Sequence, residues 1–173
     1  MEKDGIELHS LIPIEFRPIT DNDQELLYHI YAMTRMEEVK LTGWDDHRIE
    51  WFLRMQFKAQ HLHYMKNYNH ASFDIIRYHE VSIGRLYVYR NQVEIRIIDI
   101  ALLPEYRNQG IGSRIMKALI GESERKGIPL TLHVESNNPA QSFYSRLGFV
   151  KADDIGIYCF MRRMPQTTSQ EGG

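Results

Sequence analysis

The sequence predicts a mixed α/β domain built on one sheet, and three observations predict it. Two segments with helical spacing of apolar residues lie between residues 20 and 62. Three segments rich in branched and aromatic residues follow, between residues 72 and 103. After Pro104, helical and strand patterns alternate. Neighbouring strands followed by β/α alternation are typical of a mixed sheet covered by helices.

Length and composition indicate one domain. The chain has 173 residues, 43% of them hydrophobic, and a formal net charge of -2, which gives no electrostatic reason to bind nucleic acid or an anionic membrane. One cysteine excludes an internal disulfide, and no apolar run reaches the ~20 residues of a membrane span. We therefore expect a cytoplasmic protein with an extension at 1–13, a domain at 14–165 and a disordered tail at 166–173.

The N-terminal elements follow from spacing and capping residues. Residues 14–19 predict a short strand, whose proline suits a sheet edge. Thr20 and Asp23 have the pattern of a capping box, and the helix that follows should end near Met36. A loop then precedes a longer helix from Asp45. Its buried face is expected to carry apolar residues at helical spacing, namely Ile49, Phe52, Leu53, Phe57 and Leu62.

The remaining elements are read in the same way. Strands are expected at 72–79, 82–90 and 93–103, separated by short polar turns. The helix after Pro104 should bury apolar residues of one side, Ile111, Ile115, Ala118 and Leu119, and end at Gly127. A strand at 128–135 follows, then a short helix that Asn138 caps and Gly148 ends. One last strand is expected at about 155–163.

The most informative segment is residues 107–113, Arg-Asn-Gln-Gly-Ile-Gly-Ser, which joins a buried strand to a helix. The first N–H groups of a helix lack intrahelical partners, and glycine lets a pyrophosphate approach them closely. The alternative is a glycine-rich turn whose amides bind only water. The P-loop pattern is absent, and the dinucleotide fingerprint would need a third glycine and a later acidic residue.

Two motifs together resemble the GNAT superfamily of N-acetyltransferases. The segment IALLPEYRNQGIGSRIM is similar to the family's strand, (Arg/Gln)-x-x-Gly-x-(Gly/Ala) and helix, and NNPAQSFYSRLGF is similar to its second motif. They cover residues 93–150. The resemblance implies a twisted, mostly antiparallel sheet of six to seven strands, flanked by about four helices and splayed between the fourth and fifth strands. It also implies transfer of an acetyl group from acetyl-CoA to a primary amine by direct attack.

The resemblance also assigns residues to the coenzyme. The amides from Gln109 to Ser113 would hold the pyrophosphate, the backbone of Ala101 to Leu103 would pair with the pantetheine arm, and Asn137 or Asn138 would touch the arm further along. The implied coenzyme-binding residues are Ala101, Leu102, Leu103, Arg107, Asn108, Gln109, Gly110, Ile111, Gly112, Ser113, Asn137 and Asn138.

Tyr144 lies where many family members keep a tyrosine beside the thioester sulfur. There it would protonate the leaving thiolate, which a phenol near the sulfur can do. The alternative is a core aromatic residue packed beside Phe143 and Leu147.

Several residues are candidates for the base that accepts the proton of the amine. Asp99 is the leading candidate for the base, because a carboxylate inside IIDIALL is costly to bury unless it is paired or reaches a polar cleft. Its alternative is a structural ion pair with Arg96 or Arg85. The rivals for the base are acidic or imidazole side chains of the neighbouring strands, Glu94, His133 and Glu135.

Acceptor recognition is expected at the loop between the first two helices. The loop contains Met36, Glu37, Glu38 and Trp44. Its acidic side chains, with Trp44 as an aromatic neighbour, would suit a cationic amine through charge and cation–π contact, and a solvated loop with ordinary surface charges is the alternative. The acceptor would be a small molecule or a peptide, and the resemblance is compatible with a homodimer.

No metal site is expected, since His61 and His63 lie about 200° apart on a helix. The competing function is a non-catalytic domain that binds or senses acyl-CoA.

Overall fold

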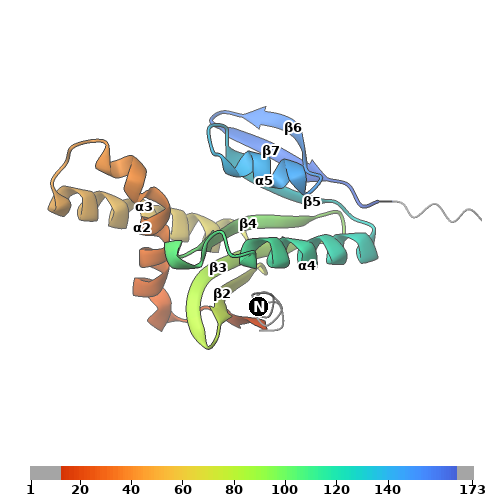
Figure 1. Cartoon of the computed structure of the whole chain (residues 1–173), viewed down its shortest axis with the longest axis horizontal. Helices are drawn as coiled ribbons and strands as arrows, with labels where there is room; N and C mark the ends of the chain where they lie inside the picture. The colour runs from red at the N-terminus through yellow and green to blue at the C-terminus, as the bar shows by residue number, and fades with distance from the viewer. Residues whose placement is uncertain (1–12, 167–173) are drawn as a thin grey trace, which may run out of the picture. The chain divides into compact units, whose positions relative to one another are not determined.

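The computed structural model describes residues 13–166. The predicted extension, apart from Pro13, and residues 167–173 of the predicted tail lie outside the described residues. The strands form a seven-stranded sheet in the order β1-β2-β3-β4-β5-β7-β6. The pairing of β4 with β5 is parallel and the rest of the sheet is antiparallel, so the predicted GNAT fold, with its splay between these two strands, is confirmed (Figure 1).

The elements follow the predicted order. The strands are β1 (Ile14–Pro18), β2 (Ser72–Tyr78), β3 (Val81–Arg90), β4 (Ile95–Leu102), β5 (Leu130–Glu135), β6 (Val150–Ile155) and β7 (Tyr158–Arg163). The helices are α2 (Gln24–Lys40), α3 (Asp46–Asn67), α4 (Ile111–Lys126) and α5 (Ala140–Arg146). Two single 3₁₀ turns, η1 (Asp21–Asp23) and η2 (Pro104–Tyr106), precede α2 and α4.

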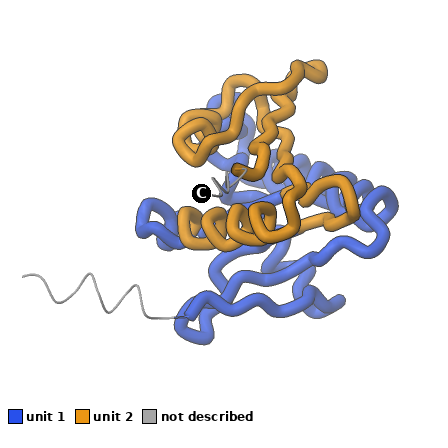
Figure 2. Tube along the Cα trace, turned by 90° about the vertical axis from the view of Figure 1, so that its right-hand side faces the viewer, with its two compact units in different colours: residues 1–87, 99–111 blue, residues 88–98, 112–173 orange. Residues whose placement is uncertain are grey.

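The chain divides into two compact units (Figure 2). The first comprises the described residues up to Tyr87 together with Asp99–Ile111, and the second comprises Val88–Ile98 and the described residues from Gly112 on. The first unit's core takes buried residues from α2, α3, β2 and β3, among them Leu27, Ile30, Leu53, Ile75, Ile76 and Ile83. The second unit's core takes them from α4 and the C-terminal strands, among them Ile115, Met116, Leu130, Leu132 and Met161.

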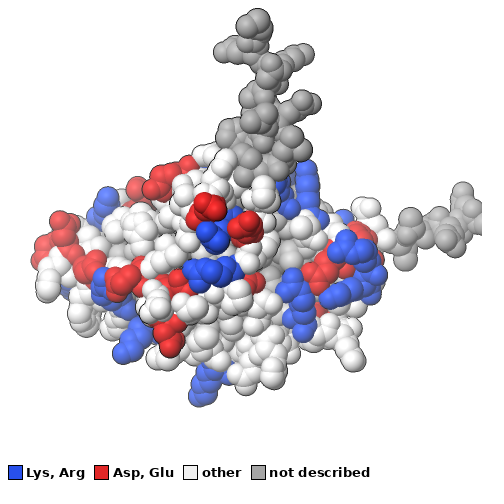
Figure 3. Space-filling view, turned by 90° about the horizontal axis from the view of Figure 1, so that it is seen from below, with Lys and Arg blue, Asp and Glu red and all other residues white. Residues whose placement is uncertain are grey.

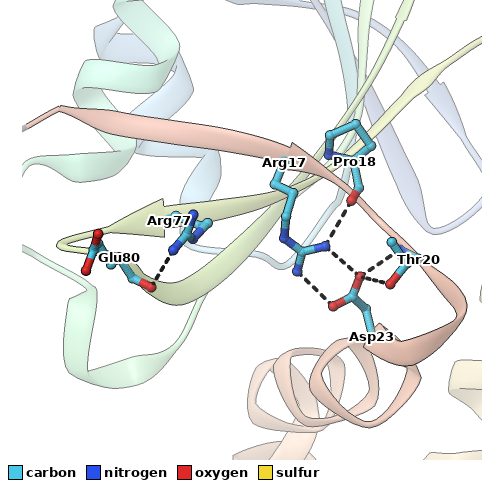
Figure 4. A network of polar contacts seen from close by, with 6 residues as sticks. All are labelled: Arg17, Pro18, Thr20, Asp23, Arg77 and Glu80. Atoms are coloured by element: carbon cyan, nitrogen blue, oxygen red, sulfur yellow. Dashed lines mark hydrogen bonds and ion pairs between the residues drawn. The ribbon is translucent and has the colours of Figure 1, made fainter.

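An ion pair fastens the start of α2 to β1 (Figure 4). Arg17 donates two hydrogen bonds to the Asp23 carboxylate, at 2.9 and 2.8 Å, and the Thr20 amide donates a third at 2.6 Å. The capping box predicted from Thr20 and Asp23 is present. The hydrogen bonds from Arg17 lower the pKa of the buried Asp23, and the hydrogen bonds from the amide and hydroxyl of Thr20 lower it further.

Two helix predictions differ from the structure. Helix α2 continues to Lys40 rather than ending near Met36, because Met36, Glu37, Glu38 and Lys40 are good helix formers and nothing before Leu41 stops the helix. In α3, Leu62 is 58% exposed. The buried stripe advances by four residues at a time through Ile49, Leu53 and Phe57, so it turns away from Leu62 toward the polar and aromatic positions that follow.

Two smaller corrections concern the C-terminal half. On α4, Ala118 is exposed and Met116 is buried in its place. The predicted single last strand is the hairpin of β6 and β7, which turns at Gly156 with φ +61°. Strand β6 was missed because every one of its residues is exposed, so it shows no alternation of apolar and polar side chains.

Acidic and basic side chains are mixed on the face shown in Figure 3, so no large area of that face carries charge of one sign only. Among the described residues, several charged side chains form ion pairs, such as Arg54 with Glu25 and Glu50. No helix within residues 13–166 has the length and apolar character needed to cross a membrane.

Candidate functional site

The turn before α4 has an unusual backbone that follows from its sequence. Asn108 and Gly110 both lie in the left-handed region, with φ of +58° and +79°. Asparagine and glycine are the residues that adopt this conformation at least cost, so the segment Asn-Gln-Gly reverses direction sharply before α4 begins at Ile111. The sequence motif predicted the turn but not the part that Asn108 plays in it.

Side chains of the turn hold it to the preceding residues. Arg107 Nε donates to the Leu102 carbonyl at 2.9 Å, and Gln109 Nε2 donates to the Glu105 carbonyl at 2.6 Å. Arg107 and Gln109 are themselves exposed. The turn is therefore shaped by its own hydrogen bonds before any ligand arrives, which lowers the entropy cost of binding.

The amides of this turn remain available for an anion. Within residues 13–166, no backbone hydrogen bond of a loop or cap uses an N–H from Gln109 to Ser113 as donor. The N–H groups of the first helical turn point along the helix axis, away from the helix. An added Cβ would meet nothing within 4 Å at Gly110 or at Gly112, so the approach to these amides is open. The local geometry fits a pyrophosphate.

The end of β4 is held by β3 through a close approach at Gly84. The Leu103 amide donates to the Ile83 carbonyl at 2.8 Å, and the Leu103 carbonyl accepts from the Tyr106 amide at 3.0 Å. Both backbone groups of Leu103 therefore already have protein partners. Pairing of Ala101 and Leu102 with the pantetheine arm stays a prediction.

Replacing Gly84 with alanine should destabilise the protein and weaken coenzyme binding together. A Cβ at Gly84 would overlap the Ala101 carbonyl oxygen, which belongs to backbone and cannot move aside. We expect a loss of about 2 kcal/mol in the free energy of unfolding, measured with urea. Gly121→Ala is the control for an added methyl group, since the nearest atom to its Cβ is the flexible end of Arg125 at 3.3 Å and alanine is favourable inside a helix; this variant should not lose stability. A Gly84→Ala variant as stable as wild type would contradict the close approach.

Asp99 lies in a partly buried polar cluster of the first unit. Its Oδ2 accepts a hydrogen bond from Arg85 Nη2 at 2.6 Å, and Tyr64 Oη lies 3.5 Å from the same oxygen. Arg85 is only 2% exposed and also donates to Gln60 at 2.8 Å. The ion pair named as the alternative for Asp99 is thus present, with Arg85 as the partner. A role for Asp99 as the base stays a prediction.

Replacing Asp99 with asparagine should cost about 2 kcal/mol of unfolding free energy, because the buried Arg85 charge loses its countercharge while a hydrogen-bond acceptor remains. Urea unfolding at pH 7 measures the loss. The control is a double-mutant cycle with Arg85→Met, in which the double variant should lose less than the two single variants together. Additive losses would show that the two side chains are not coupled.

The rival carboxylate Glu94 is also paired. Arg96 Nη2 lies 2.8 Å from Glu94 Oε1, and Thr131 Oγ1 donates to Glu94 Oε2 at 2.7 Å. Thr131 is buried, and its strand β5 lies beside β4. His133, two residues further along β5, lies with its ring centroid 5.0 Å from that of Phe160.

Tyr144 lies on α5, half-buried between two aromatic rings of its own unit. Its ring centroid is 5.5 Å from Phe143 and 5.8 Å from Phe149. Phe149, which follows the helix, is thus a packing partner of Tyr144 as well. The carbonyl of Tyr144 accepts hydrogen bonds from Leu147 and Phe149, which end the helix before Gly148, at φ +91°. This packing fixes the ring, and a fixed ring is compatible with both roles considered for the hydroxyl.

The asparagines before α5 are exposed. Asn138 was predicted to cap α5, but the N-cap residue is Pro139; Asn138 Oδ1 instead accepts from the first amide of the helix, that of Ala140, at 2.9 Å. The helix itself begins one residue after Pro139. The side chain of Asn137, the preceding residue, takes no part in this hydrogen bond.

The residues predicted to contact the acceptor lie on different elements. Glu37 is exposed in the last turn of α2, not in a loop, and Trp44 lies between α2 and α3. Arg48 Cζ is 4.3 Å from the Trp44 ring centroid, so the cation–π contact predicted for a substrate is made by a residue of the protein. No group of three or more potential metal ligands occurs within the described part of the chain.

Comparison with known proteins shows which protein family and which individual proteins this chain resembles. The model of the Acetyltransferase (GNAT) family matches residues 29–149. The ribosomal protein bS18-alanine N-acetyltransferase of Escherichia coli K12 is 38% identical over 61 residues, which are 34% of this chain and 41% of that protein. The match therefore spans less than half of that relative.

Solved structures agree in fold. The PaiA N-acetyltransferase of Thermoplasma acidophilum, in complex with coenzyme A, has a TM-score of 0.64 and 21% identity, covering 88% of this chain and 99% of its own. The Escherichia coli ribosomal-protein-S18-alanine N-acetyltransferase has a TM-score of 0.58 and 17% identity, covering 93% and 99%. At these identities the likeness shows the fold alone. The family model, which spans most of the chain, shows more: the protein belongs to the Acetyltransferase (GNAT) family.

Proposed function

We propose that this protein is an N-acetyltransferase that moves the acetyl group of acetyl-CoA to a primary amine by direct attack. The observation that carries the proposal is the turn before α4, whose open amides and exposed Arg107 suit a diphosphate. Membership of the acetyltransferase family supports the same donor.

The residues of the turn would bind the coenzyme, and its thioester would supply an activated acyl carbon. The amides of Gln109 to Ser113 would hold the diphosphate. Ala101 and Leu102 would align the pantetheine arm by main-chain hydrogen bonds, and Asn137 would contact the arm through its side chain.

Tyr144 would act as the acid. Attack of the amine forms a C–N bond and breaks the C–S bond, so the leaving sulfur carries a negative charge that a hydroxyl can neutralise. A separate base must take the proton that the amine nitrogen loses. Asp99 is the sequence-based candidate, and its ion pair with Arg85 gives it a structural role as well.

The acceptor is proposed to be a small molecule or a peptide, and the curated relatives favour including peptides with an N-terminal alanine. The test is release of coenzyme A thiol from acetyl-CoA with a panel of such peptides, polyamines and aminoglycosides, without and with enzyme. Acceptor-dependent release supports the proposal. Tight coenzyme binding with no release under any acceptor would instead support an acyl-CoA sensor.

Replacing Glu37 with glutamine should raise the Michaelis constant for a cationic acceptor by about two- to threefold, because an exposed charge contributes only a few tenths of a kcal/mol. Glu38→Gln is the matched control, since Arg35 lies 3.5 Å from Glu38 and offsets its charge. Steady-state kinetics at low ionic strength measure both. Equal constants for wild type and Glu37→Gln would remove Glu37 from the acceptor site.

A further inference from the structure

Helix α3 carries a second apolar stripe, on the side opposite the one that packs in the core of the first unit. On this outer side, Trp51, Met55 and Leu62 are 62%, 43% and 58% exposed. With 3.6 residues per turn, their three directions lie within about 40° of one another around the helix axis. Single exposed apolar residues are ordinary on a protein surface, whereas an aligned row of large ones marks a contact surface.

The outer stripe has the spacing of a coiled-coil contact. Trp51, Met55, Lys58, Leu62 and Met65 follow one another at steps of four, three, four and three residues. This is the alternation of d and a positions in a heptad repeat. Met65 is half-buried and the other four are exposed. The apolar stripe of a second helix therefore fits along this side of α3 over two heptads, whereas an extended peptide has the wrong period.

The outer side of α3 is positively charged. After Glu50 the helix contains no acidic residue. Lys58 lies within the stripe and Lys66 lies on its border, and neither forms an ion pair within residues 13–166. Arg54, on the other border, is already held by Glu25 and Glu50. The two lysines therefore leave uncompensated positive charge beside the apolar side chains.

This charge selects the chemistry of the partner. A second copy of the chain would bring two positive borders together, and a parallel pairing would also place Lys58 against its own counterpart. An anionic membrane would satisfy the charge, but a helix that lies in a membrane surface presents an uninterrupted apolar face, and here Lys58 interrupts it. A helix with acidic residues beside its apolar stripe satisfies both the spacing and the two lysines.

We propose that the outer side of α3 is a docking surface for an amphipathic helix of a partner protein, with acidic residues beside the apolar stripe of that helix. Trp51, Met55 and Leu62 pack against the apolar stripe, and Lys58 and Lys66 pair with the acidic side chains. Because the contact is short and exposed ion pairs are weak, it is transient, with a dissociation constant of about 10–100 µM. These residues lie outside the candidate site, so the docking surface does not depend on the proposed function.

The test uses Trp51 as its reporter. Replacing Trp44 with phenylalanine leaves Trp51 as the only indole of the chain. The probe is a synthetic helix of about three heptads with leucine at a and d and glutamate at e and g, and a second peptide has lysine in place of each glutamate. The glutamate peptide should move the Trp51 emission to shorter wavelength and bind more weakly at high salt. The lysine peptide should cause no shift, because its charges repel those of α3.

Charge reversal on α3 makes the prediction specific. Lys58→Glu together with Lys66→Glu should weaken binding of the glutamate peptide by about tenfold or more and give the lysine peptide measurable affinity. The matched control is Lys40→Glu together with Lys117→Glu, which makes the same change in net charge at exposed lysines of α2 and α4. The control should keep the wild-type preference. Urea unfolding of each variant checks that it is folded.

Three results would overturn the proposal. Equal affinity for the two peptides, or no response to either, would show that α3 does not select an acidic helix. Vesicles of phosphatidylserine and phosphatidylcholine that shift the Trp51 emission, when the glutamate peptide does not, would assign this side of α3 to a membrane surface. A dimer in sedimentation experiments that Leu62→Gln dissociates would assign it to a second copy of this chain.

Discussion

Replacing Tyr144 with phenylalanine should lower kcat for thiol release by about a hundredfold while leaving the Michaelis constant for acetyl-CoA nearly unchanged. The hydroxyl is removed but the ring remains between Phe143 and Phe149, so the packing of α5 is kept. A positioned general acid contributes about 10²–10⁴-fold, and its loss affects the step in which the sulfur leaves. Single-turnover measurement with saturating donor reports that step directly.

The control for Tyr144 is Tyr68→Phe, which removes a hydroxyl from the residue that follows α3. It should leave kcat within about twofold of wild type, and both variants should still unfold in a single cooperative transition in urea. If Tyr144→Phe releases thiol as fast as wild type, the tyrosine is a packing residue and another group protonates the sulfur.

Replacing Gly112 with aspartate should weaken coenzyme A binding by about a hundredfold without destabilising the fold. Gly112 lies in the first turn of α4, and its Cβ position faces open space. A carboxylate there is favourable for the helix, whose N-terminus is positive, but repels a diphosphate held on the same amides. Two like charges about 4 Å apart near a protein surface repel by up to about 4 kcal/mol, and salt screens part of this repulsion. A hundredfold loss, which is about 2.7 kcal/mol, is therefore expected.

Gly112→Asn is the matched control, because asparagine has nearly the size of aspartate and no charge. Calorimetric titration with coenzyme A should show a much smaller loss for asparagine than for aspartate, and the difference should shrink at high salt. Equal affinities for wild type and Gly112→Asp would mean that the diphosphate does not lie at this helix end.

Sequence reasoning located the elements with strong periodicity and missed those without it. β2, β3 and β4 were predicted because branched and aromatic residues mark them. β6 was missed because all of its side chains are exposed, so only its pairing with β7 makes it a strand. Leu62 was placed inward because it is apolar, whereas the inward positions near it are Gln60 and Tyr64, which contact Arg85 and Asp99.

The candidate site was predictable where backbone conformation depends on residue type. The motif at 107–113 indicated a glycine turn before a helix, and the structure has one. The close approach of Gly84 to Ala101 could not be predicted, since it depends on how β3 and β4 pair. The partner of Asp99 was narrowed to two arginines by sequence, and only the folded chain distinguishes Arg85 from Arg96.

Calorimetric comparison of coenzyme A with pantetheine tests the central claim most directly, because pantetheine keeps the arm and lacks the diphosphate with its attached nucleotide. Adenosine 3′-phosphate, which carries the nucleotide without the diphosphate, is the control and should bind no more tightly than pantetheine. If the turn from Gln109 to Ser113 holds the diphosphate, coenzyme A should bind at least about a hundredfold more tightly than pantetheine, a difference of about 2.7 kcal/mol. Equal affinity for the two ligands, or no heat with coenzyme A, would contradict the account.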